Sequence, residues 1–276
     1  MKFRSTSLLG GILISFTLSP IQADPGTNFQ SKLLSASQIV SQCDNKYAGK
    51  DQITKLSVTV KNKFGNEQKT IYKRFWKSVN DNSDASDKLS LFTVSPPDAK
   101  NTVFLQHSFK PNLDKNAEQW IYLPTLRKVR RTTVRDLSDS FLGTDLTFDD
   151  IRIRYPKDDF HKLISTNTKT NKTIYIVESK PKENNSIYSK KIVHYEMSNT
   201  DGNCLKKQIT YFDKNHGLIK KQTIDWQQID NAWLWKKVEV KNAQTFGSTL
   251  FEVSQAKVNV GVPDKWFNMR MLRRGL

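Results

Sequence analysis

The feature that most constrains this chain is a long succession of short strand-like runs separated by turns. Between residues 53 and 258, segments rich in Val, Ile, Thr, Phe, Tyr and Trp alternate apolar with polar positions. Gly, Pro, Asn and Asp stand between these segments, as at residues 64–66, 201–203 and 215–217. About a dozen antiparallel strands at such close spacing are typical of a barrel or a strongly curved sheet.

Helices are predicted only at the two ends of this region. The first would begin near Ser35 and stop at Gly49. Its apolar face would be formed by residues at helical spacing: Ile39, Val40, Cys43 and Tyr47. A second, short helix is predicted at residues 265–272. No Pro-rich linker or low-complexity tract divides the chain, so we expect one domain at residues 24–276.

Residues 1–23 have the anatomy of a secretory signal peptide. Lys2 and Arg4 precede a short apolar core at residues 8–18, and the small residue Ala23 follows. We expect cleavage after Ala23 and a soluble, exported protein. A retained N-terminal anchor helix is the alternative, but the apolar run is too short to span a bilayer.

The formal net charge of +17 favours anionic partners. Nucleic acid, an anionic membrane surface and an acidic protein all satisfy that criterion. Export argues against nucleic acid, and the lysines are spread over nearly every predicted strand, as on a solvated outer face. We therefore expect no nucleic-acid partner. The two cysteines, Cys43 and Cys204, are compatible with a disulfide in an oxidising compartment and equally with two buried free thiols.

No catalytic or metal-binding motif is apparent in the sequence. The four histidines are far apart, and HExxH, CxxC, P-loop and GxSxG spacings do not occur. Asp149 and Asp150 are adjacent, so they would point in different directions and make a poor acid–base couple. Helix capping or pairing with Arg152 and Arg154 is the simpler role for them. We expect no enzymatic activity, no cofactor and no metal.

Most predicted strands have one apolar and one polar face. At residues 219–224, one face would carry Ile219, Lys221 and Thr223 and the other Lys220, Gln222 and Ile224. We assign Lys220 to the wet face. The apolar face could be covered by packed side chains, by the first helix, or by a small ligand.

The segment WIYLPTLRKVRR, residues 120–131, joins an apolar strand to a group of cations. Alternation would place Lys128 and Arg130 on one face and Arg127 and Arg131 on the other. Asp145, Asp149 and Asp150 of the next block could pair with these cations. An ion-paired hairpin edge around an aromatic core is one interpretation, and a cationic rim beside a concave apolar surface is the other.

Two motifs carry a family resemblance. QWIYLPTLRKVRR at residues 119–131 and FLGTDLTFDDI at residues 141–151 resemble the outer-membrane lipoprotein-sorting (LolA-like) family of exported Gram-negative proteins. The likeness extends to FTVSPPDAKNTVFL at residues 92–105 and to Phe267 and Leu272. Asn101 stands where the family usually has Gly, and no residue here matches the arginine with which lipoprotein carriers hold their closed state.

The resemblance implies an incomplete, strongly curved antiparallel β-barrel of about 11–12 strands, with helices covering the open side. It implies a monomeric periplasmic carrier that holds acyl chains of a lipid or lipoprotein, beside an inner-membrane exporter of the resistance-nodulation-division type and an outer-membrane acceptor. The apolar groove is then expected to involve Phe75, Trp76, Phe92, Phe104, Trp120, Tyr122, Leu123, Phe141 and Phe148. Arg127, Lys128, Arg130 and Arg131 are expected near its mouth, facing head groups or an acidic partner.

Two other functions are compatible with the same sequence. One is an envelope stress or regulatory module that binds a protein on this scaffold. The other is a basic protein that binds anionic polymers, with an affinity that falls steeply with salt.

Overall fold

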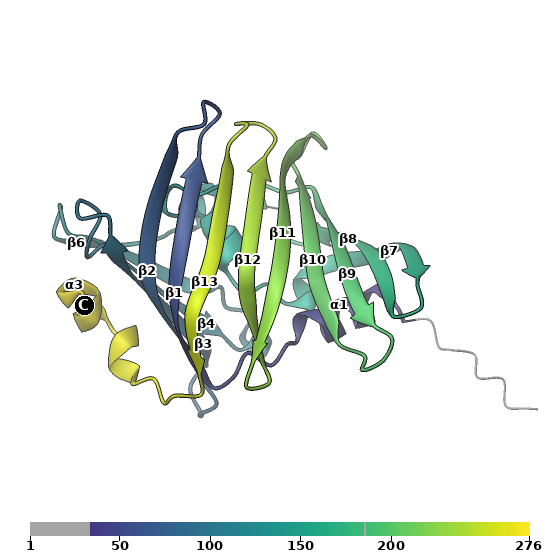
Figure 1. Cartoon of the computed structure of the whole chain (residues 1–276), viewed down its shortest axis with the longest axis horizontal. Coiled ribbons are helices and arrows are strands. Elements are labelled where there is room, and N and C mark those ends of the chain that lie inside the picture. Colours follow the sequence, from purple (N-terminus) through teal and green to yellow (C-terminus); the bar gives the residue numbers. More distant parts are fainter. Residues whose placement is uncertain (1–33, 185) are drawn as a thin grey trace, which may run out of the picture. The chain divides into compact units, whose positions relative to one another are not determined.

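Thirteen antiparallel strands form one sheet in the computed structural model, which describes residues 34–184 and 186–276 (Figure 1). The order is β6-β5-β4-β3-β2-β1-β13-β12-β11-β10-β9-β8-β7. The strands are β1 (Asp51–Lys61), β2 (Glu67–Ser78), β3 (Ala85–Ser95), β4 (Val103–Phe109), β5 (Glu118–Leu123), β6 (Lys128–Arg131), β7 (Asp159–Thr168), β8 (Lys172–Pro181), β9 (Lys190–Ser198), β10 (Cys204–Phe212), β11 (Leu218–Ile229), β12 (Ala232–Asn242) and β13 (Ser248–Val258).

The sheet is strongly curved and does not close, because β6 and β7 form its two edges. These edge strands are consecutive in the chain, and residues 132–158 run between them across the open side. This segment contains the short turns η2 (Val134–Ser138), η3 (Phe141–Gly143) and η4 (Pro156–Asp158) and the helix α2 (Phe148–Ile151). The predicted incomplete antiparallel barrel with a covered open side is therefore confirmed, with slightly more strands than expected. The predicted signal peptide and its cleavage site lie outside the described residues.

Helix α1 (Ala36–Asp44) also lies on the concave side of the sheet (Figure 1). It begins with a capping box, in which the side chains of Ser35 and Gln38 each accept a bond from the backbone of the other residue. Ile39, Val40 and Cys43 are buried, as the helical spacing predicted. The helix ends at Asp44 rather than at Gly49. Tyr47 therefore lies outside it and is 51% exposed, which corrects its assignment to the buried face.

The cysteines connect this helix to the sheet. The structure contains a disulfide between Cys43 of α1 and Cys204 at the start of β10. An ion pair between Lys206 Nζ and Asp44 Oδ1, 3.0 Å apart, lies beside it. One end of α1 is therefore held to β10 by a covalent bond and an ion pair.

The convex face of the sheet is covered in part by the C-terminal segment. The predicted helix at residues 265–272 is divided into a turn η5 (Asp264–Phe267) and a helix α3 (Met269–Arg274). Phe267 and Leu272 are buried against Phe75 of β2 and Phe92 of β3, and Trp266 stacks on Phe75 with ring centroids 4.6 Å apart. Parts of strands β2 to β5, such as the end of β2 at Phe75 and Trp76, are consequently covered on both faces.

Two smaller elements complete the description. A short turn, η1 (Pro111–Leu113), follows β4. In the part of the chain that the structure describes, no helix has both the length and the apolar character needed to cross a membrane.

Candidate functional site

A cavity of about 500 Å³ lies between the concave face of the sheet and the segments that cover it. One side is formed by α1 and the residues after it, including Val40 and Ala48. The other side is formed by Phe141 and residues 149–156. This volume is within the usual range for small-molecule sites, about 300–1,000 Å³.

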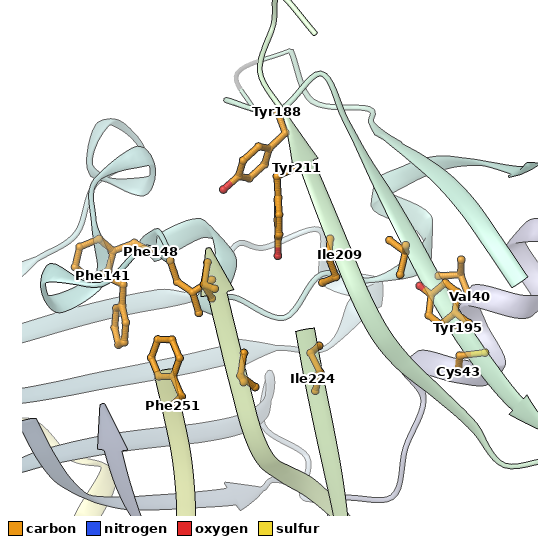
Figure 2. Close-up of a cluster of buried hydrophobic side chains, with 14 of the residues drawn as sticks. Val40, Cys43, Phe141, Phe148, Tyr188, Tyr195, Ile209, Tyr211, Ile224 and Phe251 are labelled. Atoms are coloured by element: carbon orange, nitrogen blue, oxygen red, sulfur yellow. The ribbon is translucent and has the colours of Figure 1, made fainter. Parts of the chain in front are cut away.

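The walls of the cavity are mainly apolar. Leu56, Val193, Ile209, Ile224 and Phe251 project from five different strands into one core cluster. Figure 2 shows Phe141 facing Phe251, with Val40 and Cys43 beside Tyr195. Further lining comes from tryptophans and leucines: Trp76, Trp226, Trp233, Trp235, Leu89, Leu91 and Leu234.

The FLGTDLTFDDI motif forms part of the cover over the cavity. Its turn is possible because Leu142 and Gly143 adopt positive φ angles of 50° and 79°. The turn places Phe141 and Phe148 beside Phe104 of β4, with ring centroids 4.9 and 6.3 Å from that ring. All three rings are buried. Phe104, Phe141 and Phe148 therefore form a packed aromatic cluster, called the aromatic plug below, and Phe141 of this cluster lines the cavity.

Buried polar contacts fasten this cover to the sheet. Lys220 of β11 donates to Asp150 Oδ2 at 2.5 Å and to the backbone oxygen of Asp145 at 2.8 Å. Asp145 accepts a hydrogen bond from the Thr249 hydroxyl of β13 at 2.7 Å. Burial alone would raise the pKa of Asp150, but the nearby Lys220 and Lys191 ammonium groups outweigh it and lower that pKa. The ion pair therefore keeps Asp150 charged.

Two sequence-based expectations about these residues were wrong. Lys220 lies on the inner face with Gln222 and Ile224, whereas Lys221 and Thr223 are exposed. Its charge is tolerated because it is paired with Asp150. The acidic residues of the motif also do not pair with the cations of residues 127–131. Asp150 binds Lys220, and Asp149 binds Arg152.

The cavity contains a polar region around Arg74 and Asp87. The Arg74 guanidinium donates to Gln52 Oε1 at 2.7 Å, and burial lowers the pKa of Arg74 to about 10. The carboxylate of Asp87 accepts hydrogen bonds from the hydroxyls of Ser86 and Ser108. Burial raises the pKa of Asp87 despite these bonds and the nearby Arg74. The cavity is thus amphipathic rather than uniformly apolar.

The predicted groove residues do not all reach the cavity. Trp76 and Phe141 line it, while Phe104 and Phe148 belong to the adjoining core. Phe75, Phe92, Trp120 and Tyr122 instead belong to the cluster on the convex face. The physical reason is strand alternation: Phe75 and Trp76 are neighbours in β2 and must point to opposite faces. Leu123 ends β5 opposite Lys128 and does not line the cavity.

The four cations also lie away from the cavity. Arg127 occupies a turn with φ of 48°, and Lys128 is exposed on β6. Arg130 pairs with Asp136, and Arg131 pairs with Glu118 at 2.7 Å. None of the four lines this cavity, so the expected cationic rim is not formed there. Of the two interpretations of residues 120–131, the ion-paired hairpin edge agrees with these positions and the cationic rim does not.

Several lining residues were missed by sequence reasoning. Strands β9, β10 and β12 contribute Val193, Tyr195, Ile209, Tyr211 and Trp235. Their alternation was visible in the sequence, but it could not show which face is concave. A metal site is not indicated either: within residues 34–184 and 186–276, no three His, Cys, Asp or Glu side chains cluster as ligands.

A smaller polar cavity of about 230 Å³ adjoins the first. The two cavities share Asp149, Arg152, Ile153, Arg154 and Tyr155 as lining residues. Arg152 is paired with Asp149, and Arg154 Nε donates to Asp159 Oδ2 at 2.8 Å. These ion pairs lie where the two cavities adjoin.

Comparison with known proteins identifies related folds. A family model described as an uncharacterized protein matches residues 85–274. No match was found among curated proteins.

Three solved structures show the same fold. A domain from Vibrio parahaemolyticus, named for outer membrane lipoprotein sorting, is 22% identical over 81% of this chain and 92% of its own, with a TM-score of 0.70. A DUF1329 family protein from Desulfovibrio piger is 21% identical over 86% of this chain and 97% of its own, with a TM-score of 0.76. A LolA superfamily protein from Nitrosomonas europaea is 14% identical over 86% of this chain and 99% of its own, with a TM-score of 0.63.

Proposed function

The chain belongs to the family whose model matches residues 85–274, and it shares the fold of the LolA superfamily. We propose that it is a non-enzymatic periplasmic carrier of acyl chains. In this proposal the mature protein binds the acyl chain of a lipid or lipoprotein in its cavity and moves it towards the outer membrane. An inner-membrane exporter would be the donor and an outer-membrane protein the acceptor.

One observation supports the proposal more than any other: the cavity of about 500 Å³ beneath α1 and the FLGTDLTFDDI segment. Each methylene that leaves water for such a site contributes about 0.8 kcal/mol. A chain of 12 to 16 methylenes would therefore gain on the order of 10 kcal/mol before ordering costs. Burial of hydrocarbon is sufficient for carriage, and no chemical step is needed.

The basic surface is consistent with this role. The formal charge of +17 favours approach to anionic membrane surfaces, where acyl chains are collected and delivered. The cations of residues 127–131 would act in that approach from the edge of the sheet rather than at the cavity. The lipoprotein-sorting name of the Vibrio domain supports an acyl-chain cargo for the fold.

Filling the cavity tests the proposal. Ile224 is 3% exposed and lines the cavity, so Ile224→Trp should occupy ligand space. Ile164 on β7 is 50% exposed, and Ile164→Trp is the matched control. We expect lipid copurification, measured by native mass spectrometry, to fall at least about tenfold in the first variant and to stay unchanged in the second.

The opposite result would count against carriage. If protein purified from its own envelope never contains lipid, or if both variants retain it equally, the cavity is not a lipid site. A protein-binding role on the same scaffold would then be favoured.

A further inference from the structure

Lys191 is a cation on the cavity wall without a carboxylate partner. It lies on β9, two positions before Val193 on the same face, and both residues line the cavity. Its ammonium lies over two aromatic rings, 4.9 Å from the centroid of Tyr188 and 5.2 Å from that of Tyr211. Among the described residues, no carboxylate oxygen is within 4.0 Å of Lys191 Nζ, and no hydrogen bond from it is formed.

Four other cations in or beside the cavity differ from Lys191, because each has its own carboxylate. Lys220 pairs with Asp150, Arg154 with Asp159, and Arg152 with Asp149. Lys206, further along the wall, pairs with Asp44. Asp44, Asp149, Asp150 and Asp159 are thus already engaged in ion pairs.

Asp150 is the carboxylate that most strongly attracts Lys191, but its oxygens are occupied. Oδ2 accepts hydrogen bonds from Lys220, from the Tyr188 hydroxyl and from the Thr147 backbone. The Tyr188 hydroxyl also lies 3.0 Å from Oδ1. Lys191 therefore receives long-range attraction from Asp150 without a direct contact.

The two tyrosine rings do not fully offset the burial of this charge. A cation–π contact returns only part of the free energy that an ammonium group loses when it leaves water. Burial accordingly lowers the pKa of Lys191. Lys191 is half-buried and lines the cavity, so its ammonium group is stabilised when an anion enters that cavity.

We infer that Lys191 binds the anionic head group, a carboxylate or a phosphate, of a single-chain amphiphile whose tail lies along Val193 and Ile209. This inference rests on the proposed carrier function and narrows its cargo to acidic lipids. An uncharged acyl group would leave Lys191 without a partner, because nothing in it can replace water around the ammonium. The alternation of β9 and β10 places the cation and the apolar wall on one continuous surface.

Three twelve-carbon ligands separate head group from tail: dodecanoate, dodecyl phosphate and dodecanol. Their affinities are measured by calorimetry for the wild type, Lys191→Met, Lys191→Arg and the control Lys221→Met. Lys221 is exposed on β11 and does not line the cavity. Thermal melting of each variant shows whether it is folded.

We expect the wild type to bind at least one of the two anions at least about tenfold more tightly than dodecanol. Lys191→Met should lose that preference and keep its dodecanol affinity, while Lys191→Arg and Lys221→Met should keep both. Whichever of dodecanoate and dodecyl phosphate shows the larger loss identifies the head group.

Equal wild-type affinity for all three ligands would overturn the inference and leave the carrier function standing. So would a Lys191→Met variant that keeps the anion preference. If none of the three ligands binds the wild type, the carrier proposal and this inference both fail. If Lys191→Met does not fold, the affinities of the wild type for the two anions and for dodecanol still test the inference.

Discussion

Lys220 Nζ lies 2.5 Å from Asp150 Oδ2, with the two side chains 2% and 1% exposed. The pair joins β11, in the middle of the chain's second half, to α2 in the segment that crosses the open side of the sheet. The aromatic plug and the cavity beneath it therefore depend on a buried electrostatic contact between residues 70 positions apart.

Asp150→Asn should strongly destabilise the protein. It would leave the Lys220 ammonium buried without a counter-charge, and breaking a buried pair in this way costs about 3–5 kcal/mol. Urea unfolding followed by tryptophan fluorescence measures the change. The double variant Asp150→Asn with Lys220→Met should recover most of the loss, because no isolated buried charge remains. A single-variant loss below about 1 kcal/mol would show that the pair is not structurally important.

Asp87→Asn should stabilise the protein at neutral pH. Burial raises the pKa of Asp87 in the folded state, so its protonated form is the one that folding favours. The stability linked to this group is present below the unfolded pKa, about 3.9, and is lost as pH rises through the folded pKa. Asp87→Asn removes the carboxylate charge, so the variant keeps at pH 7 the stability that the wild type loses when Asp87 ionises.

The pH profile of Asp87→Asn provides the check. The gain in unfolding free energy over the wild type should shrink as pH falls towards about 4. Asp84→Asn, at an exposed position three residues earlier, is the control and should change little. A destabilised Asp87→Asn protein at neutral pH would contradict the burial argument.

The architecture could be predicted because it depends on local patterns. Period-two alternation and turn residues located the strands to within a few residues, so that the expected run at 53–63 corresponds to β1 at 51–61. Capping by Ser35 and the spacing of Ile39, Val40 and Cys43 located α1. The incomplete closure of the barrel and the segments that cover its open side were predicted only from the family resemblance of the two motifs, because no local sequence pattern indicates them.

The faces of the strands could not be predicted in the same way. Where the C-terminal segment covers the convex side, large apolar residues stand on both faces of a strand, so Phe75 and Trp76 of β2 look equivalent in sequence. Lys220 is buried only because Asp150 meets it from a distant segment. Such long-range pairs decide which charges are inside, and they leave no local signal.

Phe267→Ala and Phe141→Ala should distinguish the role of the convex face of the sheet from that of the concave face. Both side chains are almost fully buried, so each truncation should cost about 3–5 kcal/mol. Phe267 belongs to the convex cluster, and its loss should leave lipid affinity within about twofold of the wild type. Phe141 lines the cavity, and its loss should also weaken lipid binding. Parallel calorimetry and urea titration test this, and an equal effect of both variants on affinity would mean that the faces are wrongly assigned.

The disulfide between Cys43 and Cys204 closes a loop with a sequence separation of 161. A cross-link of this kind restricts the unfolded chain, and its removal typically costs about 2–5 kcal/mol. It also holds α1 on β10, which restrains one wall of the cavity. We therefore expect Cys43→Ala with Cys204→Ala to lower the unfolding free energy by that amount and to speed the release of a bound fluorescent fatty acid in stopped-flow measurements. Treating the wild type with a reductant should reproduce both effects, whereas the double variant should be insensitive to it. If release is unchanged while stability falls, the cavity opens on the side of residues 141–156 and α1 is a fixed wall.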